Sequence, residues 1–291
     1  MKPFSLRGSA LAVATALSSL AAAPALSQDF GSEFESIQTP QGGLNLIGLG
    51  VAGVPDFYGS DKHQGAPVPI FRYFMQGTNR YVQLLGPEVV VNVLDRPDWR
   101  LGPVLRVRGR RDDDVDNDVV KRMRPVPAAT EVGVFAAYNL YLSREQPLHK
   151  VVFGGDVVGN TTGVYNGASG NLRVNYFYPF PRAWLGGRPS VGSIGLGLFW
   201  ASESFTTKYF GVTGSDLALY PTLGGRPSLP GGGLVSVKIP FSVTTQINPK
   251  WLLTVGGRYE RLTGDAKDSP VVQLHGNENQ WLLGIAASYA F

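Results

Sequence analysis

The sequence predicts an all-β fold, a transmembrane antiparallel β-barrel, and three observations lead to this class. The N-terminus is typical of an export signal. Many later segments alternate apolar with polar or small residues, which is the period of a β-strand. The 37 Gly and 21 Pro indicate many short strands and turns rather than helices.

Residues 1–27 form a predicted signal peptide. Lys2 and Arg7 provide a positive head, residues 8–23 are rich in Ala and Leu, and small residues predict cleavage after Ser27. The apolar run is shorter than the roughly 20 residues of a membrane-spanning helix. A mature chain in a membrane would therefore cross it as a closed barrel. We expect residues 28–43 to be a periplasmic N-terminal arm and residues 44–291 to be the barrel.

Charge and cysteine content exclude several functions. The chain has 26 Lys+Arg and 22 Asp+Glu, and removal of the signal peptide leaves a net charge of about +2. Nucleic acid is therefore not an expected partner. The absence of Cys excludes disulfides and thiolate metal sites.

The C-terminal segments show the alternation most clearly. One face of the last segment carries Trp281, Leu283, Ile285, Ala287, Tyr289 and Phe291, and the segment 251–259 repeats the pattern between Trp251 and Tyr259. Rings eight residues apart lie about 26 Å apart along a strand, which fits the two aromatic girdles of an outer-membrane barrel. We expect Tyr289 and Phe291 to serve also as the C-terminal signal for the barrel-assembly machinery.

Four further segments have an apolar face that is predicted to contact lipid: Leu101, Leu105 and Val107; Leu172, Val174, Tyr176 and Tyr178; Ile194, Leu196, Leu198 and Trp200; and Val235, Val237, Ile239, Phe241 and Val243. A soluble β-sandwich also alternates, but it has no use for stripes that end in aromatic residues. The signal peptide also favours the barrel.

Twelve strands follow from placing both termini in the periplasm. The long segments 110–129, 159–170, 203–233 and 263–278 then lie outside, while the links 95–98, 143–148, 179–189 and 247–250 lie inside. For a first strand at 44–54 that runs outward, the stretch 80–94 must be two short strands broken near Gly86-Pro87. Ten strands are the alternative, because a break at one Pro does not by itself exclude a single long strand there.

The predicted inner face carries more cations than carboxylates. The cations are Arg100, Arg106, Arg108, Arg110, Arg173, Lys238 and Arg258, and the carboxylates are Glu131 and Glu260. Such a surplus would favour anions in a pore. Alternatively, the charges pair across a narrow lumen and plug it.

Two motifs that suggest cofactor or metal sites lack the necessary context. Gly48 to Gly53 fits a dinucleotide-binding string, but Pro55 and a loop follow where a helix must begin. The acidic run 112–118 lacks the Gly and Glu of a calcium loop. We therefore expect no cofactor and no metal site. The acidic run is expected to be a solvated loop, and at most its carboxylates share divalent cations with lipopolysaccharide phosphates.

Catalysis is not expected. A hydrolase needs an activated nucleophile near a base, and the chain has only His63, His149 and His275. Neither G-x-S-x-G nor H-E-x-x-H occurs.

Several blocks carry a family resemblance: Pro55 to Ser60, Pro67-Val68-Pro69, Trp99 to Pro103, Arg108-Gly109-Arg110, Glu131-Val132-Gly133, Tyr209 to Val212 and, above all, Tyr259 to Val272. With these blocks the chain after the signal resembles the MipA/OmpV family of outer-membrane proteins. Ser215-Asp216-Leu217 departs from the Ser-Gly-Leu expected there. The resemblance implies an outer-membrane barrel without catalytic residues, and a scaffold that binds a murein lytic transglycosylase or other peptidoglycan-remodelling proteins.

Three functions are compatible with the sequence. The first is this scaffold in envelope maintenance. The second is a narrow channel for small, including anionic, solutes. The third is a surface adhesin that uses the loop 203–233.

Overall fold

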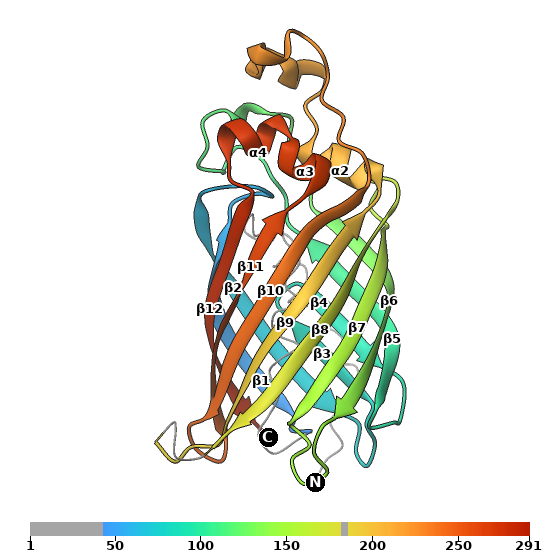
Figure 1. The fold of residues 1–291 in the computed structure, drawn as a ribbon, viewed down its shortest axis with the longest axis vertical. Coiled ribbons are helices and arrows are strands. Elements are labelled where there is room, and N and C mark those ends of the chain that lie inside the picture. The colour runs from blue at the N-terminus through green and yellow to red at the C-terminus, as the bar shows by residue number, and fades with distance from the viewer. Residues whose placement is uncertain (1–42, 182–185) are drawn as a thin grey trace, which may run out of the picture.

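The computed structural model describes residues 43–181 and 186–291. The predicted signal peptide and the predicted arm up to residue 42 lie outside this part. Twelve antiparallel strands follow one another around a closed barrel, and β1 pairs with β12 to close it (Figure 1). The predicted fold and strand number are confirmed, and the ten-strand alternative is wrong. Among the described residues, no helix combines the length and apolar character that a membrane span requires.

The strands are β1 (Leu46–Pro55), β2 (His63–Phe74), β3 (Tyr81–Leu85), β4 (Glu88–Asn92), β5 (Trp99–Arg108), β6 (Ala129–Tyr141), β7 (Lys150–Asn160), β8 (Ala168–Phe180), β9 (Ser190–Ala201), β10 (Gly233–Gln246), β11 (Trp251–Leu262) and β12 (Asn279–Ala290). The helices are α2 (Glu203–Phe210), α3 (Gly264–Asp268) and α4 (Pro270–His275), with 3-10 turns η2 (Val120–Arg122), η3 (Gly214–Leu219) and η4 (Pro221–Leu223).

Apolar side chains on the outside of the barrel are exposed, as expected for a surface that lipid covers. Leu172, Ile194 and Leu283 are 67%, 55% and 57% exposed, the inverse of a soluble core. Trp251 contacts Tyr289 near one end of β11 and β12, and Tyr259 contacts Trp281 near the other, with ring centroids 5.4 and 4.9 Å apart. These two pairs match the predicted girdles.

Two side chains predicted to face lipid are buried instead. Val235 is buried because the register of β10 against β9 shifts between Leu234 and Ser236, and Leu234 takes the outward position. An irregularity of this kind reverses the alternation. Val107 is buried near the end of β5, where its N–H donates to the carbonyl of Pro87.

The predicted break at Gly86-Pro87 is confirmed and leaves a short hairpin in the wall. Gly86 adopts a positive φ of 54° in a two-residue turn between the paired residues Leu85 and Glu88. In the described chain, β3 pairs with β2 only over residues 70–74. The part of β2 that precedes residue 70 has no partner strand on the β3 side among the described residues. It contains Pro67 and Pro69, which have no N–H, so fewer backbone donors of this edge remain unpaired.

Loops cover one end of the barrel, here called the outer end. Helices α2, α3 and α4 lie across it, whereas Phe291 and the short links lie at the opposite end, here called the periplasmic end after the predicted topology (Figure 1). The loops are joined by contacts such as the hydrogen bond from the Ser269 hydroxyl to the carbonyl of Phe210. A buried aromatic cluster beneath them contains Tyr58, Phe199, Phe205, Tyr209 and Phe210.

Candidate functional site in the barrel lumen

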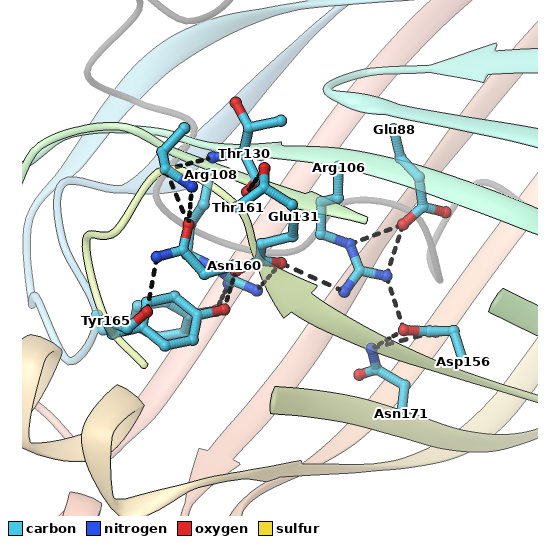
Figure 2. A network of polar contacts seen from close by, with 12 residues as sticks. Glu88, Arg106, Arg108, Thr130, Glu131, Asp156, Asn160, Thr161, Tyr165 and Asn171 are labelled. Atoms are coloured by element: carbon cyan, nitrogen blue, oxygen red, sulfur yellow. Dashed lines mark hydrogen bonds and ion pairs between the residues drawn. The ribbon is translucent and has the colours of Figure 1, made fainter. Parts of the chain in front are cut away.

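An ion-pair network occupies the middle of the lumen. Arg106 on β5 lies between Glu88 on β4 and Asp156 on β7, with nitrogen–oxygen distances of 2.6 and 2.9 Å (Figure 2). Its guanidinium also lies 3.9 Å from Glu131 on β6. Because adjacent residues of a strand point to opposite faces, the polar residues of these four strands can meet inside while apolar neighbours face lipid.

The network continues along the inner wall to β10. Asp156 accepts hydrogen bonds from Arg173 and Asn171 on β8, each at 3.2 Å. Lys238 on β10 donates to the Asn171 side-chain oxygen at 3.1 Å. We call Glu88, Arg106, Asp156, Asn171, Arg173 and Lys238 the lumen belt. All six side chains are buried or nearly so, with Arg173 at 7%.

A second ionic group lies towards the outer end. Arg108 donates to both carboxylate oxygens of Glu131 at 2.7 and 3.0 Å, and the Tyr165 hydroxyl donates to the same carboxylate at 2.6 Å (Figure 2). The Arg108 guanidinium also donates to the Tyr58 hydroxyl. It lies 5.0 Å from the ring centroid of Phe205. This arginine therefore joins the barrel wall to the aromatic cluster through charge and cation–π contacts.

A third ion pair, between Arg258 and Glu260, lies on the inner wall at β11. Both face inward from β11, with a nitrogen–oxygen distance of 2.9 Å, and each is 1% exposed. The Ser236 hydroxyl on β10 donates to Glu260 at 2.5 Å. Paired carboxylates and cations thus lie along the inner wall on strands from β4 to β11.

The periplasmic end contains a cavity of about 780 Å³, here called the vestibule. Arg72 donates to Gln83 at 2.8 Å and Arg100 donates to Asn139 at 2.9 Å. Lys150 lies 5.7 Å from the ring centroid of Phe177. Among the described residues that line the vestibule, Arg72, Arg96, Arg100 and Lys150 are cationic and none is Asp or Glu.

Most predicted lumen charges lie inside and contact one another. Arg106, Arg108, Arg173, Lys238, Arg258, Glu131 and Glu260 take part in the networks above, and Arg100 lines the vestibule. The prediction for Arg110 is wrong. Because β5 ends at Arg108, Arg110 lies in the following loop and pairs with Asp112 at 2.9 Å and Asp114 at 3.3 Å.

Sequence reasoning missed Glu88 and Asp156, which bring the charges at mid-height close to balance. On β7, Asp156 lies an even number of residues from Lys150 and Val152, so alternation along the strand would have placed its side chain on the same inward face. Arg72 and Lys150 in the vestibule were missed as well. The cationic surplus is therefore at the periplasmic end.

The remaining motifs have structural explanations. Gly48 and Gly50 lie in β1, where a Cβ would approach Ala287 and Ala286 of β12 within 2.5 and 2.8 Å. These glycines allow the closing strands to pack together. Phe291 extends beyond β12, and its N–H donates to the Asn45 carbonyl. Recognition of Tyr289 and Phe291 during assembly stays a prediction.

The chain was compared with known families and proteins. Residues 47–291 match the family described as MltA-interacting protein MipA. The outer membrane protein Omp26La of Vibrio anguillarum is 25% identical over 195 residues, which cover 66% of this chain and 65% of that protein. The chain therefore spans slightly less than two thirds of this relative's length.

Solved outer-membrane structures are similar in fold alone. An outer membrane channel of Pseudomonas putida F1 is 14% identical, with a TM-score of 0.44 over 85% of this chain and 96% of that one. The outer membrane channel DcaP of Acinetobacter baumannii is 9% identical, with a TM-score of 0.35 over 88% of this chain and 99% of that one.

Proposed function

The chain belongs to the MltA-interacting protein MipA family, and we propose that this outer-membrane barrel is a closed scaffold that binds a peptidoglycan-remodelling protein. The partner class is a murein lytic transglycosylase or another enzyme of the same process. The observation that carries the proposal is the lumen belt, because a barrel filled by its own ion pairs offers its surfaces rather than a pore.

Opening the lumen would have a high energetic cost. Arg106, Glu88 and Asp156 are each at most 8% exposed, so separating them would leave buried charges without partners. The Arg108–Glu131 pair and the aromatic cluster fill the outer half above them. The proposal assigns the chain no catalytic step, since binding alone accounts for a scaffold.

The periplasmic face is the surface that such a partner can reach. Its links are short, and exposed polar residues such as Arg80 and Arg144 lie on them. Short links between strands hold side chains in fixed positions, which suits the binding of a folded protein. On the outer side, we propose that the loops contact lipopolysaccharide.

Binding of the purified full-length barrel to a purified murein lytic transglycosylase tests the scaffold. We expect saturable binding that weakens at least tenfold in the Arg80→Glu/Arg144→Glu variant. Arg226→Glu, an exposed change on the outer side, is the matched control and should bind like the wild type. Absence of binding, or equal weakening by Arg226→Glu, would contradict the proposal.

A second candidate function is a narrow channel for small solutes, and the cationic vestibule favours it for anions. It requires the lumen belt to open. Ion conduction by the folded chain would therefore favour the channel over the closed scaffold.

Export by the predicted signal peptide is also proposed. Cleavage after Ser27 would leave Gln28 as the first residue of the mature chain. N-terminal sequencing of protein from outer membranes should begin at Gln28, and a sequence that begins at Met1 would contradict it.

A further inference from the structure

The loop between β7 and β8 contains the single Asn-Gly pair of the sequence, Asn166-Gly167. Both residues are exposed at the outer end of the barrel. Asparagine is among the chemically labile residues. It is most labile before glycine, because any other side chain would hinder the approach of the next backbone nitrogen to the amide carbon. The pair is therefore a candidate site of spontaneous modification.

The fold favours glycine at position 167. Gly167 has a φ of 139°, which side chains of L-residues disfavour. A Cβ at this position would lie 2.2 Å from the hydroxyl oxygen of Ser202. The residue that follows Asn166 therefore carries no side chain for a structural reason, and its backbone is free of the hindrance that would protect the asparagine.

The groups that would react are not held by hydrogen bonds. The backbone N–H of Asn166 donates to the Ser204 hydroxyl at 2.7 Å. Among the described residues, neither the Asn166 side-chain amide nor the Gly167 N–H forms a hydrogen bond. The amide carbon and the neighbouring nitrogen can therefore approach each other without breaking a contact.

Asn160 begins the same loop and provides a comparison within the chain. Its side-chain N–H donates to the Tyr165 carbonyl at 2.8 Å, and its side-chain oxygen accepts from the Thr162 N–H at 2.9 Å. The next residue is the β-branched Thr161. Both the fixed amide and the bulky neighbour oppose ring closure at Asn160.

We propose that Asn166 deamidates spontaneously in the folded barrel. The Gly167 nitrogen gives its proton to hydroxide and bonds to the side-chain carbonyl carbon of Asn166. The bond from that carbon to the amide nitrogen breaks, and the nitrogen takes up a proton from water and leaves as ammonia. Water then opens the five-membered succinimide at either carbonyl, which gives aspartate or isoaspartate. This inference does not depend on the proposed binding partner.

The modification would act on the contacts that hold α2 to this loop. Asn166 donates to Ser204 in the first turn of α2, and the Ser202 N–H at the start of α2 donates to the Ala168 carbonyl at 2.9 Å. These two contacts lie on either side of the Asn-Gly peptide bond. Isoaspartate adds one methylene to the backbone between them, so we expect the first turn of α2 to loosen.

Peptide mapping by mass spectrometry tests the reaction. The full-length barrel, folded in lipid, is incubated at pH 8 in water enriched in ¹⁸O, and folding is checked by resistance to denaturation in detergent. We expect Asn166 to convert at least tenfold faster than Asn160, to take up one ¹⁸O atom and to give both aspartate and isoaspartate. Conversion should be slower at pH 6, because the Gly167 nitrogen must lose its proton. Equal rates at Asn160 and Asn166, or aspartate without isoaspartate, would overturn the proposal.

Asn166→Gln is the control variant. Its longer side chain would have to close a six-membered ring, so we expect no conversion over the same time, and the fold should be kept because the Asn166 side chain forms no hydrogen bond with the described residues. Amide hydrogen exchange in α2 should become faster in the wild type after incubation and stay unchanged in Asn166→Gln. The same change in both proteins would show that modification of Asn166 does not loosen α2.

Discussion

Arg108 and Glu131 form a two-point ion pair inside the barrel, with distances of 2.7 and 3.0 Å. They lie diagonally across β5 and β6, since Arg106 is the residue directly opposite Glu131. Both are at most 1% exposed. The pair therefore fixes the position of the Arg108 guanidinium beside the aromatic cluster.

Removing one member of this pair should destabilise the barrel strongly. Glu131→Ala leaves the buried Arg108 without its carboxylate, which we expect to lower the free energy of unfolding by about 3–5 kcal/mol. Urea unfolding of the refolded protein in lipid measures this change. Arg108→Met/Glu131→Leu should recover much of the loss, because it leaves no buried charge unpaired. A double variant less stable than Glu131→Ala would contradict this reading.

Charged residues introduced on the lipid face should lower the stability of the barrel by an amount that depends on their depth in the bilayer. Ile285 lies in the middle of β12 opposite Val255, whereas Trp251 begins β11 at the periplasmic end. We expect Ile285→Arg to lower stability by about 2–4 kcal/mol and Trp251→Lys by about 0–1 kcal/mol. Equal stabilities of both variants and the wild type, measured by unfolding in lipid, would show that these faces do not contact lipid.

The strand pattern was readable from the sequence because lipid imposes apolar residues on one face of nearly every strand. Local irregularities were not readable: the shift at Leu234 buries Val235, and the end of β5 at Arg108 places Arg110 in a loop. The lumen belt was predicted only in outline. Glu88 and Asp156 are single acidic residues in apolar or Gly-rich segments, and their shared partner Arg106 becomes evident only when the strands are placed around the barrel.

Acid should loosen the outer loops at His275. Partial burial holds the pKa of His275 below its ordinary value of 6.5, so the folded state disfavours the proton. As the pH falls through 6.5 towards the folded-state pKa, the unfolded chain binds the proton first and local stability decreases. Below the folded-state pKa no further loss arises from this group.

Amide hydrogen exchange in residues 264–278 would measure this effect. We expect faster exchange at acidic than at neutral pH after correction for the intrinsic rate, and a smaller difference in His275→Gln. The same difference in both proteins would show that His275 does not cause it.

Single-channel recording of the refolded mature chain in a planar bilayer tests closure of the lumen most directly. A salt gradient across the bilayer reads ion selectivity, and resistance to denaturation in detergent confirms that the protein is folded. The lumen belt predicts a folded protein that gives no steady conductance steps. Steady steps from the folded wild-type chain, with a preference for anions, would contradict the closed barrel and support the channel.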